Sequence, residues 1–470
     1  MGLSSILSTA TGGLGVVQTQ LQWRTDNINN ETNTNYSRRD PTTLSTGSHG
    51  VTTTITRATD ASLQKQYTDA NSQAAASTVT SDYWSRLADV AGTSQSTPYL
   101  EQAMDSYTAA WKAFETDTSS ATSEANVVAT GKTMADTITS AAQQLIQIRD
   151  EAKSSAGDDV TSLNGKLSDL AAINKKLSAD PNAATNQPDL LDQRDTLVND
   201  VSALVGVYTV PHSDGSVALY SKTGAVLVDK EASQYQWNTN TAGQGYISVA
   251  GSTETAPGEN ASFSGGKIGA TLDLLNPSTT ASDPNVGMLA KAQAQLDAFA
   301  SQLADTTSTS SLEGSYDAAT SDRTTDLASG FFTIDTTGAV SASQSLTVDA
   351  GLVAGTSTVK RQSATAVVAQ LTAASRTMST AGVNASNTTY SGLAAAIAGY
   401  QSDSQATASS DKTRATTTAT TLQTRLTSET GVNLDTEMAQ MTVLQNAYAA
   451  NAKVITTVQA MFDVLMNIGS

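Results

Sequence analysis

The 470-residue chain contains no cysteine, which excludes disulfide bonds, thiolate metal sites and cysteine nucleophiles. It has only two histidines, and aromatic residues make up 5% of it. The motifs HExxH, CxxC and the phosphate-binding GxxxxGK(S/T) do not occur. The sequence thus offers no recognisable catalytic or metal-binding pattern, and we expect neither an enzyme activity nor a cofactor.

Positive charge is scarce, because 26 Lys and Arg stand against 44 Asp and Glu, a net charge of −18. Nucleic acid phosphates and an anionic membrane surface would both be repelled. No stretch approaches the roughly 20 continuous apolar residues of a membrane span. The first 20 residues lack the basic region that begins a secretory signal peptide. We therefore expect no nucleic acid partner, no membrane partner and no export through a cleavable signal.

Two groups of carboxylates are candidate metal ligands. They are Asp158 with Asp159, and Asp189 with Asp192 and Asp195. We expect the first pair to precede a helix and the second group to lie in the first turns of the next one. Carboxylates at these places stabilise the positive end of a helix, which we favour over metal binding.

The most regular feature is an apolar seam near the N-terminus, with spacing 4-3-4-3-4-3-4. Its members are Leu3, Leu7, Ala10, Leu14, Val17, Leu21, Arg24 and Ile28. This heptad pattern predicts a helix that packs along a partner. Gly12, Gly13 and Gly15 each weaken an isolated helix by about 1 kcal/mol relative to Ala. We therefore expect the segment to become ordered when it meets its partner.

A second seam closes the chain, where residues 432–468 contain neither Gly nor Pro. Large apolar residues recur every three or four positions at Leu434, Met438, Met441, Leu444, Tyr448, Ala452, Ile455, Val458, Phe462 and Leu465. This predicts a helix on the order of 50 Å long. Leaving the stripe in water would forgo on the order of 15 kcal/mol of burial. We expect the two seams to pair with each other and with neighbouring copies, as the assembly interface.

Between the seams, helical spacing covers residues 59–90, 99–114 and 124–178, and a further helix at 190–205 is expected to end at Gly206. Residues 27–50 are rich in Asn, Thr, Ser and Gly and suggest loop and turns. Short alternating runs in 206–275 predict strands, with turns at Asp214-Gly215 and Thr223-Gly224. A helix is predicted near 287–303, a second strand-forming patch near 330–350, and helices from 364 to the end.

These elements predict a mainly α member of the α+β class, elongated, with terminal coiled-coil helices, a long helical rod and inserted β-rich parts. We divide the chain into a terminal assembly domain (1–40 with 430–470), a helical rod (41–205 with 364–429) and β-rich outer insertions (206–363). Both termini should lie at one end of the molecule, and the β domains at the other.

Both ends of the chain resemble the flagellar axial proteins, the family of rod, hook and hook-associated proteins. The N-terminal block of that family matches at Gly13, Leu14, Gln18, Leu21, Asn27, Ile28, Asn30, Tyr36, Ser37 and Arg38. The C-terminal block matches at Gly431, Val432, Asn433, Leu434, Asp435, Glu437, Met438, Gln445, Ala447, Tyr448, Ala450, Ala452, Lys453, Val454 and Ile455. Thr436 replaces a family Glu. Asn35 replaces a family Gly, a mild change if the position has positive φ.

An internal segment narrows the resemblance to the members at the hook–filament junction. It is Leu190, Leu191, Asp192, Gln193, Arg194 and Asp195, which begin the run LLDQRDTLVNDVSALVGV. Weaker similarity is seen in GGKIGATLDLL and at the GFF of residues 330–332. Another axial subunit remains an alternative (a rod or hook protein, hook-associated protein 3 or a flagellin-like protein), as does a surface adhesin.

The resemblance implies a non-catalytic structural subunit that forms a ring with its own copies. The implied partners are the hook protein, hook-associated protein 3, the flagellar type III export apparatus and a cytosolic chaperone that binds the C-terminal helix. The implied location is the extracellular flagellum, with a cytoplasmic stage before export. Absence of cysteine agrees with export as an unfolded chain.

Overall fold

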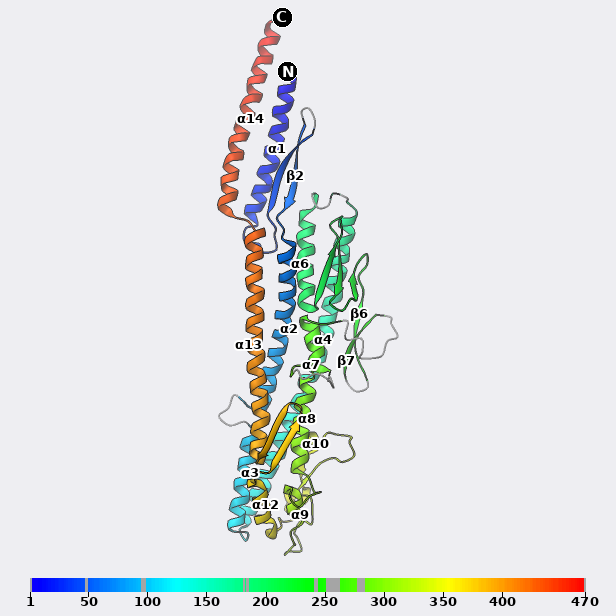
Figure 1. Ribbon diagram of the computed structural model, residues 1–470, viewed down its shortest axis with the longest axis vertical. Helices are drawn as coiled ribbons and strands as arrows, with labels where there is room; N and C mark the ends of the chain where they lie inside the picture. The colour runs from blue at the N-terminus through cyan, green and yellow to red at the C-terminus, as the bar shows by residue number, and fades with distance from the viewer. Residues whose placement is uncertain are drawn as a thin grey trace.

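The computed structural model describes residues 2–46, 50–93, 99–180, 182, 186–240, 244–250, 263–276 and 284–468. The molecule is elongated, and both termini lie at the same end (Figure 1). Long helices dominate, and each sheet of the described residues is antiparallel and small. The predicted mainly α fold is confirmed.

The terminal helices α1 (Leu3–Asn29) and α14 (Leu434–Ile468) run side by side in opposite directions (Figure 1). A hairpin of β1 (Arg39–Thr46) and β2 (Gly50–Arg57) packs against α1. The expectation of loop and turns for 27–50 holds for 30–38 but was wrong for 27–29, where α1 continues, and for the strands. The threonines of this range are β-branched and suit strands once residues 50–57 supply a pairing partner, which composition alone does not reveal.

The rod below this pair consists of long helices, with α2 lying along α13 (Figure 1). They are α2 (Ala61–Ala91), α3 (Tyr99–Thr116), α4 (Ala121–Ser178) and α13 (Tyr390–Thr430). Asp60 and Ser120 cap α2 and α4 by accepting a backbone N–H three residues on, at 2.9 and 3.2 Å. Asp158 and Asp159 lie inside α4, so their placement before a helix was wrong. Helix α4 continues through Gly157 because its apolar stripe stays buried on both sides of that residue.

One flank of the rod carries α6, two small sheets and α7. The bounds are α6 (Pro188–Leu204), β3 (Val207–Pro211), β4 (Val217–Ser221), β5 (Val226–Val228), β6 (Tyr235–Thr239), β7 (Gly245–Val249) and α7 (Gly266–Leu275). Gly215 and Gly224 have φ of 86° and 98° in the two predicted turns. Gly206 does not end α6 in a left-handed conformation. It is needed because a Cβ there would lie 2.4 Å from the Ser264 carbonyl oxygen.

The far end of the rod holds short elements. They are α8 (Met288–Leu303), α9 (Leu312–Asp317), β8 (Phe332–Thr333), α10 (Ala342–Ser345), β9 (Thr347–Val348), α11 (Ala350–Ala354), a 3-10 turn (Arg361–Ser363), α12 (Ala364–Thr372), β10 (Arg376–Thr380) and β11 (Val383–Thr388). The helix near 287–303 is confirmed. The strand-forming patch predicted near 330–350 contains only the pair of two-residue strands β8 and β9. The β10–β11 hairpin interrupts the helix expected after 364. The sheets are also spread along the molecule, from β1–β2 beside α1 to the β10–β11 hairpin on the rod, and are not gathered at the end opposite the termini (Figure 1).

Two apolar cores support these elements. The larger joins α3, the first half of α4, α8 and the start of α13, and contains the aromatic rings of Tyr107, Trp111 and Phe331. The smaller joins the second half of α4 to α6, α7 and the flank sheets. Near the larger core, buried Glu313 accepts the backbone N–H groups of Phe331 and Phe332. Burial raises the pKa of Glu313 to about 8, although these two N–H donors act to lower it.

Candidate assembly interface and the junction below it

The interface between α1 and α14 is built from small and branched side chains. Ala10 and Val17 of α1 and Val458 of α14 are buried. A Cβ on Gly13 would lie 3.2 Å from the Asn451 side-chain nitrogen, so glycine lets the two helices approach closely there. The weak helix formers of α1 are thus explained partly by packing against α14.

A buried ion pair fixes the register of α1 on α14. Arg24 Nη1 lies 3.0 Å from each carboxylate oxygen of Glu437, which is completely buried. Asp40 lies 3.6 Å from the same guanidinium nitrogen. Arg24 is the one polar member of the N-terminal seam, and this bond accounts for its place there. Shifting either helix would leave a buried charge unpaired, which costs several kcal/mol.

The predicted interface residues lie at different depths in this pair. Val17 and Val458 are buried; Leu3, Leu7, Leu14, Leu21, Ile28, Met441, Leu444 and Ile455 are half-buried; Leu434, Met438, Tyr448, Phe462 and Leu465 are exposed. Pairing with α1 therefore covers only part of the apolar surface of α14.

A second apolar stripe runs along α14 on a face that α1 does not cover. It consists of Val443, Ala450, Val454, Met461 and Leu465, all of them exposed, and we call it the free stripe. Helix α14 also extends past the start of α1 (Figure 1). In this projecting part Val464 and Met466 are 58% and 76% exposed. So much exposed apolar surface on one helix is typical of an interaction site.

A buried polar cluster lies where α1 meets the hairpin. The Asn27 side chain is fully buried and donates to the Arg39 carbonyl oxygen at 3.0 Å. Its oxygen accepts the Tyr36 hydroxyl at 2.8 Å and the Arg39 backbone N–H at 3.0 Å. Burial raises the pKa of Tyr36 well above its usual value, so the hydroxyl stays protonated and donates. Three residues near the N-terminus are thereby locked together.

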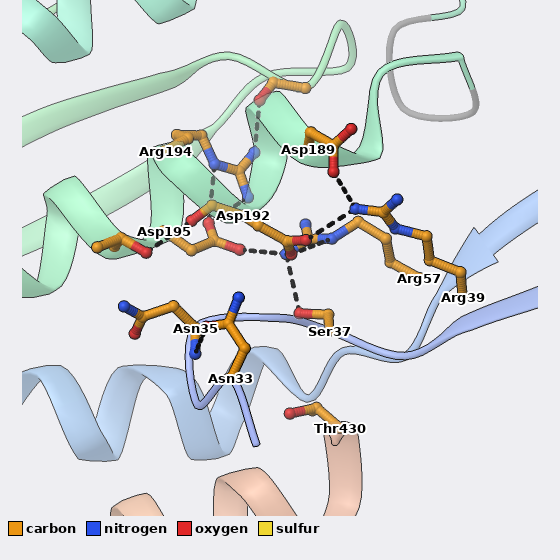
Figure 2. Close-up of polar contacts among 12 residues, drawn as sticks. Asn33, Asn35, Ser37, Arg39, Arg57, Asp189, Asp192, Arg194, Asp195 and Thr430 are labelled. Atoms are coloured by element: carbon orange, nitrogen blue, oxygen red, sulfur yellow. Dashed lines mark hydrogen bonds and ion pairs between the residues drawn. The ribbon is translucent and has the colours of Figure 1, made fainter. Parts of the chain in front are cut away.

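Two arginines of the hairpin connect it to α6 (Figure 2). Arg39 and Arg57 face each other across β1 and β2. Arg39 bonds to Asp189 and, at 3.3 Å, to Asp192. Arg57 contacts Asp192 at 2.6 Å and Asp195 at 2.8 Å, and it also donates to the Ser37 hydroxyl at 3.1 Å. The terminal helices are thus tied to the rod by charge-assisted hydrogen bonds.

The other terminal segment joins the same junction. The Arg38 backbone N–H donates to the Thr430 carbonyl oxygen at 2.7 Å, and its guanidinium donates to the Gly431 carbonyl oxygen at 3.2 Å. These bonds lie where α13 ends and the chain turns into α14. Asn433 caps α14 by accepting the Thr436 N–H at 3.0 Å.

The structure brings together Asn27, Tyr36, Arg38, Asp192, Arg194, Asp195 and Gly431 of the family-motif residues at this junction, and Glu437 lies above them. It leaves Gln18, Gln193, Asn433, Asp435 and Gln445 exposed, places Asn30, Leu190 and Val432 at half-buried positions, and buries Leu191. Asn35 does not have positive φ, so that expectation was wrong. Its N–H donates instead to the Asn33 side chain at 3.1 Å, which shapes the turn (Figure 2).

Sequence reasoning missed Arg39 and Arg57, and with them the role of the carboxylates. Asp189, Asp192 and Asp195 do begin α6 as expected, but they also form the receiving half of the junction. The available signal was a pair of arginines at the two outer ends of a Thr-rich stretch. Across the described ranges, His, Asp and Glu side chains form no group of three suited to a metal ion. None of the helices described is both long and apolar enough to cross a membrane.

Comparisons with known proteins match the interior and the C-terminal end of the chain. The family model of the helical domain of the flagellar hook-associated protein FlgK matches residues 84–322. The model of the C-terminal region of the flagellar basal body rod FlgEFG proteins matches residues 423–468. The flagellar hook junction protein FlgK from Burkholderia pseudomallei is a similar solved structure, with 23% identity and a TM-score of 0.48. That match covers 58% of this chain and 47% of the other, so the chain matches about half the length of that relative. Curated protein sequences gave no match.

Proposed function

The chain belongs to the FlgK family of flagellar hook-associated proteins, whose model covers about half of it, and from this premise we propose that it is a structural subunit of the bacterial flagellum. In this proposal it has the role of hook-associated protein 1, the junction between hook and filament, on which filament assembly depends. The role requires no catalysis. The match of residues 423–468 to the rod-protein C-terminal region supports a shared use of α14 in assembly.

The observation that carries the proposal is the uncovered surface of α14. After pairing with α1, the helix still exposes the free stripe and the projecting residues Val464 and Met466. Copies of the chain packed side by side would cover this surface, and each buried side chain would contribute about 1.5–3 kcal/mol. We therefore assign the free stripe to contacts between copies, and the Arg24–Glu437 face to contacts within a copy.

The partners follow from the proposed location between hook and filament. We propose a ring of copies, with the hook protein on one side and hook-associated protein 3 on the other. Before export, a cytosolic chaperone would cover the C-terminal helix, and the flagellar type III apparatus would carry the chain outside. The apolar surface of α14 supports a need for such cover.

A substitution on the free stripe tests the assignment. Met461→Asp places a charge on a residue that is 49% exposed, so the monomer should keep its melting temperature, and its amount in the medium separates a loss of export from a loss of assembly. The variant should fail to join the hook–filament junction, and motility should be lost. Val353→Asp changes a residue of equal exposure (48%) at the far end of the rod and serves as the matched control. Normal incorporation of the Met461→Asp protein would refute the role of the free stripe.

A deletion strain separates the proposal from a rod or hook subunit and from hook-associated protein 3 or flagellin. Loss of this protein should leave complete hooks without filaments, with monomeric flagellin in the medium. Absent hooks would favour a rod or hook protein. Location along purified hook–basal bodies distinguishes hook-associated protein 3, and normal filaments would favour a surface adhesin.

A further inference from the structure

A groove of about 780 Å³ lies on the flank of the molecule, beside the junction. One wall is the outer edge of β3 with the turn that follows it. The other walls are the first turns of α2, the face of α6 from Leu191 to Ala203, the last turns of α13 and the chain at 34–37 and 55–60. The size falls within the 300–1,000 Å³ of small-molecule sites. Ser37, Arg57, Asp192 and Asp195 of the lining belong to the junction, and the structural role proposed above gives the rest of the groove no task.

An aromatic platform borders the groove. In the sheet order β3-β4-β5, β3 is an edge strand, and its Tyr208 lies opposite Tyr220 of β4. The two rings stack with centroids 5.3 Å apart and planes 17° apart. Because Tyr220 covers one face from the β4 side, the other face of Tyr208 is turned outward, along the groove. Tyr208 is 44% exposed and lines the groove.

The remaining lining is suited to an uncharged polar ligand. Amides and hydroxyls come from Gln64, Asn71, Asn199, Gln423 and Thr427. Gln64 Nε2 donates to Asn199 Oδ1 at 2.8 Å and Asn71 Nδ2 donates to the Asn199 carbonyl oxygen at 2.9 Å, so a ligand would use the other donors and acceptors of these amides. Of the carboxylates there, Asp200 pairs with Lys166 at 2.6 Å and Asp69 with Lys222 at 2.9 Å, whereas Asp60 caps α2. The chain as a whole carries a net charge of −18, which disfavours an anionic ligand.

An added peptide strand is the main competitor, because the outer edge of β3 pairs with no strand among the described residues. The Lys222 N–H donates to the Gly206 oxygen and the His212 N–H to the Ser216 oxygen. In this register Val207, Thr209 and Pro211 direct their backbone groups away from β4. Pro211 has no N–H, so a ladder along this edge would be interrupted, as it is on protected edges.

We propose that the groove binds a neutral oligosaccharide, with one sugar ring stacked on Tyr208 and its hydroxyl groups bonded to the amides opposite. The apolar face of a sugar packs on an aromatic ring while its hydroxyl groups stay available to polar side chains. A platform bordered by amides satisfies both needs.

The test uses the purified full chain and a broad panel of neutral and sialylated oligosaccharides, with affinities then measured by titration calorimetry. The wild type should bind at least one neutral oligosaccharide, and Tyr208→Ala should weaken that binding about tenfold, whereas Tyr208→Trp should retain it. Tyr99→Ala, at a tyrosine of similar exposure (46%) on α3, is the matched control and should bind as wild type does. Melting temperatures show that each variant is folded. Three results would overturn the proposal: no neutral oligosaccharide bound, a preference for sialylated ones, or binding unchanged by Tyr208→Ala.

Discussion

Removing one partner of the Arg24–Glu437 ion pair should have unequal effects, depending on which partner is lost. Arg24→Met would leave the Glu437 carboxylate completely buried without a counter-ion. Stranding a buried charge in this way costs about 3–5 kcal/mol. Glu437→Gln would leave Arg24 with the nearby Asp40, 3.6 Å away, so the loss should be nearer 1 kcal/mol.

Hydrogen exchange in the native state measures this difference locally, since opening of α1 from α14 exposes the amides of both helices. Protection of the first half of α14 should fall strongly in Arg24→Met and weakly in Glu437→Gln. Arg24→Met combined with Glu437→Leu should recover most of the protection, because no charge is then buried. Equal and small losses in both single variants would refute the claim that this pair fixes the register.

Three further predictions concern the rod and its far end. Arg57→Ala should lower the free energy of unfolding in urea by about 3 kcal/mol, because it removes one of the two cations that pair with Asp192. Arg86→Ala breaks an exposed ion pair and should lower that free energy by less than 1 kcal/mol. Equal losses in the two variants would contradict a stabilising role of the junction. The pKa of Glu313 is raised to about 8, so its stabilising contribution is complete below about pH 4.5 and is lost as pH rises towards 8. The free energy of unfolding should be lower at pH 8 than at pH 5, and Glu313→Gln should reduce this difference. A difference that Glu313→Gln leaves unchanged would contradict the role of Glu313. Gly131→Ala would place a Cβ 2.9 Å from the Phe331 ring and should lower the free energy of unfolding by about 1–3 kcal/mol. Phe331→Leu should restore part of this loss. No change in Gly131→Ala would show that the aromatic core shifts to make room for the methyl group.

The sequence predicted the long helices because stripes of large apolar residues repeat at helical spacing over many turns. It did not predict the hairpins at 39–57 and 376–388, whose Thr-, Ser- and Asn-rich strands look like loop until a partner strand is identified. In the same way, the carboxylates of α6 were placed correctly but interpreted locally. Their arginine partners lie more than 130 residues away in the chain, and only the folded structure brings them together.

The C-terminal helix shows another limit of pattern counting. A single stripe was counted along α14, and it mixes residues that face α1 with residues that do not. Helix α14 in fact carries apolar residues around more than one face, as Val443 (60% exposed) and Val454 (40% exposed) show. Only pairing with α1 reveals which of them remain for other molecules.

Crosslinking between copies tests the central claim most directly. Because the chain has no cysteine, a single introduced cysteine is its only thiol. Met461→Cys on the free stripe should yield crosslinked dimers and larger species with a short bifunctional thiol reagent in purified hook–basal bodies, whereas Val353→Cys should not. The monomeric Met461→Cys protein in solution should form neither crosslinked dimers nor larger species. Normal flagella in which Met461→Cys forms no crosslink between copies would contradict the account.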